Sequence, residues 1–252
     1  MPDWNVHIAA RGFALMGAIP LGIALDRLRT FVLNTLTAWQ DMNPKSTRDQ
    51  IIEAADLLIY QRGYEYMSFA DISDAVKISR GNVTFHFKTR DEILEAVIGL
   101  RLDRTRRMLE QWEADGETPG DRIRSFINIL IVNRSKIMLY GCPVGTLCIE
   151  LAKLDCAALP HATEVFGLFR EWLSRQFSLL GCGAEADALA MHLLAWSQGI
   201  ATLANAFQDE NFIREEVRQL RDWLQSRAAN ARKSASRVGK ARHLRIGSGR
   251  TR

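Results

Sequence analysis

Residues 75–90 carry basic and amide side chains of the kind that contact nucleic acid. An arginine fork such as that of Arg80 matches the O6 and N7 acceptors of guanine, and the amide of Asn82 matches the edge of adenine. A solvated charged face on a small helical bundle would have the same composition, so residue types alone leave both interpretations open. The segment contains no acidic residue, and its basic residues are Lys77, Arg80, Lys88 and Arg90.

The sequence offers little for other chemistry. It has no glycine-rich phosphate loop, its histidines His161 and His192 stand alone on predicted helices, and no Ser, His and Asp pattern indicates a catalytic site. The cysteines contain no C-x₂-C pair for zinc and are too few for a disulfide scaffold. We therefore expect no enzyme activity, no cofactor and no metal. The four cysteines are Cys142, Cys148, Cys156 and Cys182.

The elements that position the basic segment are helices with clear start signals. Ser46, Ser68 and Thr89 each stand three residues before a carboxylate, the spacing of a reciprocal N-cap, and Ser79 offers a further cap. Gly63 occupies the position of a left-handed C-cap. These signals, with apolar residues at helical spacing, predict helices over about 46–62, 69–76, 80–87 and 90–114.

Helical spacing continues through the rest of the chain, with breaks at residues 118–120, 141–143 and 181–183. No window shows the alternation of a strand. The fold class predicted is therefore all-α. The further helices predicted are 120–139, 143–156, 161–180, 185–208 and 210–229.

The two short helices joined by a tight turn form a helix-turn-helix. Residues 47–94 resemble the DNA-binding domain of the TetR family of bacterial transcriptional regulators. The resemblance implies an N-terminal three-helix head followed by a helical body that binds a ligand and dimerises. The matching stretches, at the family's spacing and without a gap, are Thr47-Arg48, Ile51 to Ala55, Leu58, Arg62 to Glu65, Asp71-Ile72, Ile78 to Val83, His86 to Lys88 and Asp91 to Leu94.

Two positions depart from the family's pattern. The usual turn glycine is Lys77, for which a positive φ costs more than for glycine. The common aromatic after Val83 is Thr84, which would replace a phosphate contact by its hydroxyl or contact a thymine methyl.

The helix that begins after Ser79 is expected to enter the major groove with its N-terminal end toward the bases. Arg80 is the candidate for guanine and Asn82 for adenine, while Gly81 permits close approach. Lys88, His86, Thr47 and Arg48 are candidates for phosphate contacts. The complete set of expected DNA-contacting residues is Thr47, Arg48, Ser79, Arg80, Gly81, Asn82, Thr84, Phe85, His86 and Lys88.

The family resemblance also implies an effector pocket between the helices of the body. Residues 141–151 resemble a Gly-Cys-x-x-Gly segment found in one branch of the family, and Cys142 precedes a predicted helix start, which favours a thiolate. Cys142 is therefore either a redox or electrophile sensor or a small buried residue. The pocket or sensor candidates are Cys142, Cys148, Phe126, Phe169, Trp172 and Trp196.

A single head reads only a few base pairs, so family members bind palindromes as two-fold dimers. The family's four-helix interface uses the last two long helices, which suits 161–180 and 185–208, although 210–229 could contribute. The alternative is that these helices only close the monomer. The interface candidates are Phe166, Phe177, Leu193 and Ile200.

The composition and the distribution of charge limit which kinds of protein and which DNA-binding arguments are possible. The 252 residues are 47% hydrophobic and 25% charged, which is typical of a globular protein. Eight of the 33 basic residues and none of the 29 acidic ones follow residue 230. The basic balance therefore lies in the tail, and a DNA-binding argument must rest on local placement of charge.

The predicted organisation is an atypical N-terminal extension over 1–41, a helix-turn-helix head over 42–90, an effector-binding and dimerisation body over 91–230, and a basic disordered tail over 231–252. The extension contains an apolar run too short for a membrane span. It is interpreted as residues upstream of a true start at Met42, as a signal peptide, or as an additional arm.

We expect a cytoplasmic, sequence-specific transcriptional regulator, in the first place a repressor released from a palindromic operator by a small molecule. The expected partners are double-stranded DNA, the small-molecule effector and a second copy of the chain, with no membrane. The alternatives are a non-specific DNA-organising protein, in which the tail adds affinity, and a thiol-based regulator acting through Cys142.

Overall fold

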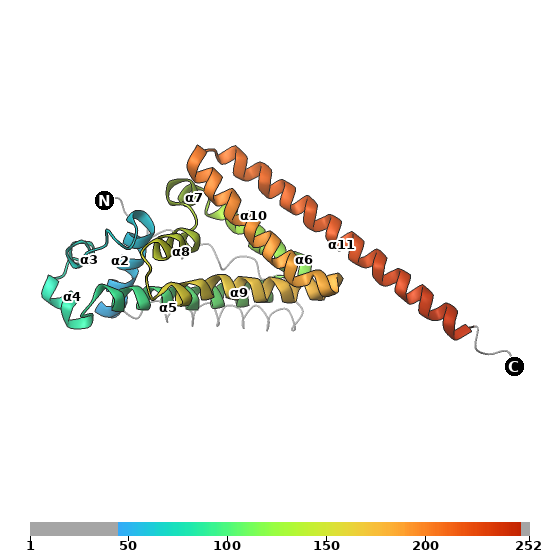
Figure 1. The fold of residues 1–252 in the computed structure, drawn as a ribbon, viewed down its shortest axis with the longest axis horizontal. Coiled ribbons are helices and arrows are strands. Elements are labelled where there is room, and N and C mark those ends of the chain that lie inside the picture. Colours follow the sequence, from blue (N-terminus) through green and yellow to red (C-terminus); the bar gives the residue numbers. More distant parts are fainter. Residues whose placement is uncertain (1–44, 248–252) are drawn as a thin grey trace, which may run out of the picture. The chain divides into compact units, whose positions relative to one another are not determined.

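The computed structural model describes residues 45–247, and from Thr47 onward the chain forms one compact unit. The expected extension over 1–41 lies outside the described residues. Within them the elements are helical, as predicted. Three helices form the head, and α5 leads from it into the body (Figure 1). These four are α2 (Thr47–Arg62), α3 (Phe69–Val76), α4 (Arg80–His86) and α5 (Arg90–Asp115).

The head helices begin where their caps predict. The Ser68 hydroxyl accepts the Asp71 N–H at 3.2 Å, and the Asp71 carboxylate accepts the Ser68 N–H at 3.2 Å, which completes a reciprocal capping box. The Ser79 hydroxyl accepts the Asn82 N–H at 3.2 Å and starts α4. Each of these helix starts is therefore stabilised by residues no more than three positions apart.

The turn between α3 and α4 has a lysine at the position where the family's pattern has glycine. Lys77 adopts a left-handed conformation with φ 60° and ψ 44°. The backbone N–H groups of Lys77 and Ile78 both donate to the Ser73 carbonyl, which closes the C-terminus of α3. The tight turn therefore forms with lysine, at the conformational cost of a side chain at positive φ.

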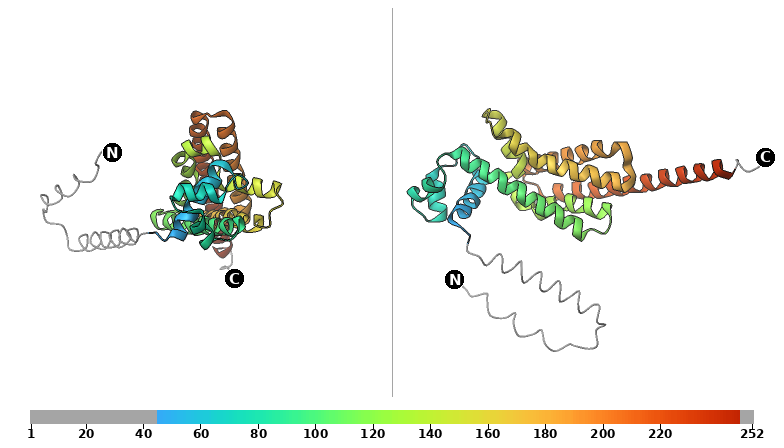
Figure 2. Two further views of the ribbon diagram at one scale, coloured as in Figure 1. Left: turned by 90° about the vertical axis from the view of Figure 1, so that its left-hand side faces the viewer. Right: turned by 90° about the horizontal axis from the view of Figure 1, so that it is seen from below.

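The body is built around α9, which packs against α5, α6, α8 and α10. A wide helical turn, η1 (Ser178–Cys182), and a short 3₁₀ turn, η2 (Gly183–Glu185), join α9 to α10. Figure 2 shows α11 packed along the body and continuing beyond the other helices. The body helices are α6 (Pro119–Val132), α7 (Arg134–Tyr140), α8 (Pro143–Lys153), α9 (Leu159–Phe177), α10 (Ala186–Phe207) and α11 (Glu210–Gly247).

Two predicted boundaries are corrected. The helix expected over 120–139 is interrupted at Asn133, whose side-chain amide donates to the Ile129 carbonyl at 3.1 Å and competes with the backbone ladder. The segment from residue 231, expected to be disordered, continues α11 as far as Gly247. Alanine and basic residues between 228 and 242 favour helix, and no proline interrupts them.

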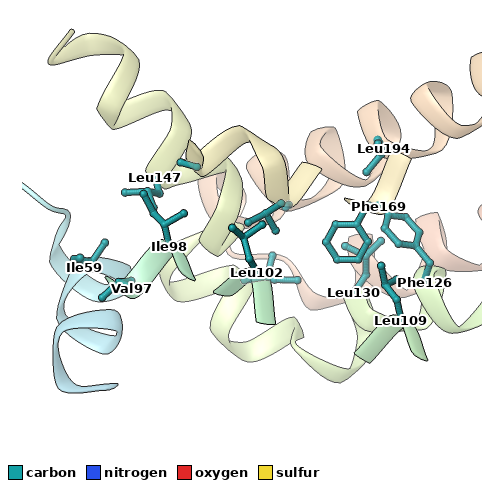
Figure 3. Packing of buried hydrophobic residues seen from close by; sticks show 14 of the residues in the cluster. Ile59, Val97, Ile98, Leu102, Leu109, Phe126, Leu130, Leu147, Phe169 and Leu194 are labelled. Atoms are coloured by element: carbon teal, nitrogen blue, oxygen red, sulfur yellow. The ribbon is translucent and has the colours of Figure 1, made fainter. Parts of the chain in front are cut away.

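Head and body share one apolar core. The connecting helix α5 carries Val97 beside Ile59 of the head, and Leu109 beside Phe126 of the body (Figure 3). These residues are at most 6% exposed. Because the core is continuous along α5, the head cannot shift without repacking side chains that also belong to the body.

One stretch of the described residues, Leu159–Phe207, is long and apolar enough by composition to cross a membrane. It consists of two helices, α9 and α10, that pack against each other on either side of the break at residues 178–185. This stretch is accordingly the centre of a helical bundle in the structure.

Candidate DNA-reading surface and ligand cavity

The exposed face of α4 carries the predicted base-reading residues. Val83 is fully buried against the head, whereas Arg80, Gly81, Asn82 and Phe85 are exposed. At 100° per residue, Gly81 and Phe85 lie opposite Val83, on the outermost line of the helix. Within residues 45–247 the Arg80 guanidinium and the Asn82 side-chain amide make no hydrogen bond or ion pair. Their donors and acceptors are therefore available to a partner.

Other residues of α4 make bonds inside the helix. The Thr84 hydroxyl donates to the Gly81 carbonyl at 3.0 Å, and the Lys88 ammonium donates to the Thr84 carbonyl at 2.8 Å. Lys88 therefore caps the C-terminus of α4, where a cation is favoured. His86 packs edge-on against the Phe85 ring, with centroids 5.2 Å apart. Phe85 itself is 74% exposed, a large apolar surface at the centre of the helix face.

The predicted phosphate contacts on α2 lie beside the end of α4. The exposed Arg48 guanidinium lies over the Phe87 ring, 4.8 Å from its centroid. This cation–π contact orients a cation next to the DNA-facing helix. Thr47 is the first residue of α2 and is partly exposed. The structure thus brings all ten predicted DNA-contacting residues to α4, its two ends and the start of α2.

The head is attached to α5 through Tyr64. The Arg90 guanidinium stacks over the Tyr64 ring at 4.8 Å and donates to the Tyr64 carbonyl at 2.6 Å. The Tyr64 hydroxyl bonds to the Asp91 carboxylate. Burial and this carboxylate raise the pKa of Tyr64 above its ordinary range, so the phenol remains a donor. The end of the head and the start of α5 are therefore rigidly connected.

A cavity of about 450 Å³ lies among α2 and α5–α10, within the range of small-molecule sites. Phe126 and Phe169 form one wall, with ring centroids 5.4 Å apart in an edge-to-face contact. Cys142 also lines it, so three predicted pocket residues meet there. Phe166, predicted at the dimer interface, lines the cavity as well. The head contributes Glu53, Asp56, Leu57 and Tyr60 of α2.

The α2 side of the cavity holds a cluster of charges. The Arg101 guanidinium donates from Nε to Asp56 at 2.7 Å and from Nη1 to the Pro143 carbonyl at 2.6 Å. Arg104 donates to Asp56 at 2.8 Å and to Glu53 at 3.2 Å. Two arginines of α5 therefore hold two carboxylates of α2. The Nη2 of Arg101 is buried and has no hydrogen-bond partner in the described part of the chain.

Two further contacts connect α2 to α8 and the turn before it. The Tyr60 hydroxyl donates to the Gly141 carbonyl at 2.8 Å, and burial raises the pKa of Tyr60 to about 12. The Glu150 carboxylate accepts the backbone N–H groups of Tyr64 at 2.9 Å and Glu65 at 3.0 Å. The end of the first head helix is thus attached to the segment that also carries Cys142.

Three predicted pocket residues lie away from the cavity. Trp172 packs its ring against Trp112, and the Trp196 indole donates to Glu216 at 2.8 Å. Cys148 is half-buried, and burial raises the pKa of its thiol. By contrast, the half-buried Cys142 is the N-cap of α8, with its sulfur 3.5 Å from the Gly145 N–H.

The predicted interface residues need a correction. Phe177 and Leu193 are fully buried and Ile200 is 2% exposed in the single chain. They fill the protomer's own core, where α9, α10 and α11 meet, and no side chain there is free for a partner. The apolar stripes of α9 and α10 are therefore inward-facing at these positions.

Sequence reasoning missed the charged side of the cavity. Arg101 and Arg104 stand three apart on α5, as Glu53 and Asp56 do on α2. Residues with this spacing share one helix face, so two complementary pairs indicate two helices packed side by side. This signal was present in the sequence but becomes specific only once α2 and α5 are known to be neighbours.

Among residues 45–247, no group of three or more His, Cys, Asp or Glu side chains is placed to hold a metal. The site consists instead of an exposed helix-turn-helix face and a mostly apolar cavity that share α2. This combination defines the class of helix-turn-helix DNA-binding proteins with a hollow helical body.

Comparisons with known proteins agree. Residues 51–97 match the family model described as bacterial regulatory proteins, tetR family. The chain is 27% identical over 175 residues to an uncharacterized HTH-type transcriptional regulator from the lacX 3′ region of Lactococcus lactis subsp. lactis, covering 68% of this chain and 89% of that protein. It is 37% identical over 54 residues to the HTH-type transcriptional regulator TtgR of Pseudomonas putida, covering 21% of this chain and 26% of TtgR.

Solved structures show the same fold. A TetR transcriptional regulator from Legionella pneumophila is 26% identical, with a TM-score of 0.64 over 72% of this chain and 98% of that one. The reduced form of E. coli NemR is 16% identical, with a TM-score of 0.60 over 70% and 96%. Residues 51–97 therefore match the DNA-binding domain of the TetR family, and the chain shares its fold with solved TetR-family transcriptional regulators.

Proposed function

We propose that this chain is a cytoplasmic repressor that binds a palindromic operator as a homodimer and leaves it when a small molecule fills the cavity. The observation that carries this proposal is the double role of α2. One face of α2 buries Ile51 and Ala55 in the head, and the other supplies Asp56 and Tyr60 to the cavity wall. A ligand there acts directly on the support of the DNA-reading helix.

The exposed residues of α4 would contact the bases. Arg80 would contact guanine and Asn82 adenine, because both side chains are exposed and make no hydrogen bond or ion pair within the described residues. Phe85 would contact a thymine methyl, since an exposed ring beside Gly81 offers apolar surface without hydrogen bonds. Ser79, Thr84 and the basic groups would position the head on phosphates. Those basic groups are Arg48, His86 and Lys88, next to Thr47.

The homodimer would form through the outward faces of α9 and α10. The exposed positions Ala188, Ala195 and Gly199 on α10 are small, and a Cβ at Gly199 or at Gly167 of α9 would meet no described atom within 4 Å outside its own stretch of helix. Small residues let two helices of a partner approach closely. This arrangement supports the expected four-helix interface without the buried residues first predicted for it.

The test is a selection of duplexes from a random DNA pool with the full chain, followed by affinity measurements over a salt series. We expect a palindrome whose affinity exceeds that of scrambled DNA by 10³ or more. If nothing is enriched and binding only weakens with salt, the chain is a non-specific DNA-organising protein and the proposal is wrong.

The role of Phe85 has its own test. Replacing single thymines of the selected operator by deoxyuridine removes only the methyl group. We expect one position at which this change weakens binding by the wild type and has no effect on Phe85→Ala. Equal sensitivity in both proteins at every thymine would contradict the contact.

A second candidate is release through modification of Cys142, because this thiol lines the cavity. An electrophile that enters the cavity would then act by covalent capture. If Cys142→Ser still leaves the operator normally when the wild type is released by an electrophile, thiol sensing is excluded. Cys182, a half-buried cysteine that does not line the cavity, supplies the control variant Cys182→Ser.

A further inference from the structure

We infer that the cavity takes a small apolar molecule with one anionic group, and that Arg101 binds this group in competition with Asp56. The inference rests on the proposed function, in which a ligand in the cavity controls the head. It adds the chemical class of the ligand and the contact through which that ligand acts.

The body side of the cavity defines the apolar part of the ligand. Its walls include the rings of Phe126 and Phe169 and the aliphatic side chains of Leu130, Val165 and Leu194. Phe126 and Phe169 already pack edge-to-face, an arrangement that leaves aromatic surface for a third ring. An aromatic or branched hydrocarbon body suits these walls and this volume.

The charges at the opposite side do not balance. Three cations line the cavity, Arg101, Arg104 and Lys136, against two carboxylates, Glu53 and Asp56. The two arginines share the carboxylates. Lys136 has no ion pair or hydrogen bond within the described residues. One positive charge is therefore left over, which favours a ligand with a single negative charge.

Arg101 supplies the specific contact. The residue is only 9% exposed, and its Nη2 is buried without a hydrogen-bond partner in residues 45–247. A buried N–H left unpaired is unfavourable, and Arg101 is one of the residues that line the cavity. A carboxylate or sulfonate oxygen would satisfy this donor, and two such oxygens match the planar fork better than a neutral group does.

Binding at Arg101 has a direct consequence for α2. The same guanidinium holds Asp56 on α2 and the carbonyl of Pro143 at the start of α8. An anion that draws on this guanidinium weakens its bond to Asp56, because both compete for the same cation. The first head helix then loses one of its attachments to the body, and the affinity for DNA falls.

Two dyes with one skeleton test the ligand class. 8-Anilinonaphthalene-1-sulfonate (ANS) and N-phenyl-1-naphthylamine (NPN) differ only in the sulfonate, and both fluoresce in apolar sites. With the full chain we expect ANS to bind at least tenfold more tightly than NPN. ANS, but not NPN, should also weaken binding to the selected operator. Equal affinities for the two dyes would overturn the inference.

Variants assign the preference to Arg101. Arg101→Gln should remove the preference for ANS and leave NPN binding unchanged, and Lys136→Gln should reduce it by a smaller factor. Arg106→Gln is the matched control, because Arg106 lies on α5, pairs with Asp103 and does not line the cavity. A preference that persists in Arg101→Gln would contradict the contact.

The variant Asp56→Asn distinguishes competition between Asp56 and the ligand for Arg101 from general damage to the cavity. Removing the competing carboxylate should raise ANS affinity severalfold, the opposite of what a disrupted cavity would give. Weaker ANS binding in this variant would overturn the competition. If Arg101→Gln does not fold, the ANS affinity of Asp56→Asn still tests the contact between the anion and Arg101.

The site of dye binding is checked by alkylation. ANS should slow modification of Cys142 by iodoacetamide and leave Cys182 unchanged. Unslowed modification of Cys142 would mean that the dye binds elsewhere and would overturn the inference.

The two proposals fail separately. A selected palindrome without a preference for ANS would contradict the ligand class alone. A preference for ANS that depends on Arg101, with no selected palindrome, would contradict the proposed function and support the ligand class.

Discussion

The head and the body of this protein are held by contacts of very different reach. In the head, Ser68 and Asp71 cap α3 across three residues, and Ser79 caps α4 across three. Around the cavity, Arg101 bonds to Asp56 across 45 residues and Tyr60 to Gly141 across 81. The head is therefore specified locally, whereas the cavity exists only when distant segments have packed.

This difference has a physical consequence for ligand response. Long-range contacts depend on the packing of several helices at once, so a ligand that alters one of them shifts the whole arrangement. Short-range caps keep the shape of each head helix unchanged. In the proposed function, a ligand would thus move the head without deforming the exposed face of α4.

The largest expected effect is on the core of the body. Phe177→Ala should lower the free energy of unfolding by about 3–5 kcal/mol, because the ring is fully buried between α9 and α11. Chemical denaturation measures this loss. The same substitution at Phe85, which is 74% exposed, should cost less than about 0.5 kcal/mol. Equal losses would show that the two aromatic residues do not differ as the structure has them.

The next effect is on DNA binding alone. Arg80→Ala should weaken binding to the selected operator by about 1–3 kcal/mol and relax the sequence preference, since a bidentate base contact is lost. Unfolding free energy and ANS affinity should stay at their wild-type values. Equal weakening on operator and random DNA would contradict base reading and reduce Arg80 to a phosphate contact.

A smaller effect on stability tests whether the head helices are stabilised by contacts between residues close in sequence. Ser68→Ala should cost about 1 kcal/mol of stability, because the first turn of α3 loses its cap. The Ser68 hydroxyl lowers the pKa of Asp71 below its ordinary value of 3.8. A lowered carboxyl pKa stabilises the fold above that ordinary value and loses its effect as the pH falls through the lowered value. The difference between wild type and variant, measured by denaturation, should therefore shrink in acid.

The smallest effect is a gain. Lys77→Gly should stabilise the head by about 0.5 kcal/mol, because relief of a left-handed side chain, worth about 1–2 kcal/mol, outweighs the added freedom of the unfolded chain. Thermal unfolding measures it. A loss of stability would mean that the lysine side chain makes a compensating interaction in solution.

The helices of the head can be predicted closely from the sequence because the contacts that start and end them join residues close in sequence. The starts and ends of α3 and α4 follow from Ser68, Lys77 and Ser79, whose partners lie within a few residues. The body helices were predicted as elements, but Asn133 interrupts one of them through its own side chain. The burial of Phe177 in the chain's own core could not be inferred. Helical periodicity shows that a helix has an apolar face, but not whether that face packs against the same chain or against a partner.

The double role of α2 limits how modular the protein is. Exchanging residues 47–90 for the head of another regulator would replace the exposed face of α4 and, in the same step, Glu53, Asp56, Leu57 and Tyr60 of the cavity. Such a chimaera would carry part of a foreign cavity wall as well as a foreign helix-turn-helix. Retaining the original cavity wall would require grafting those four side chains onto the incoming helix.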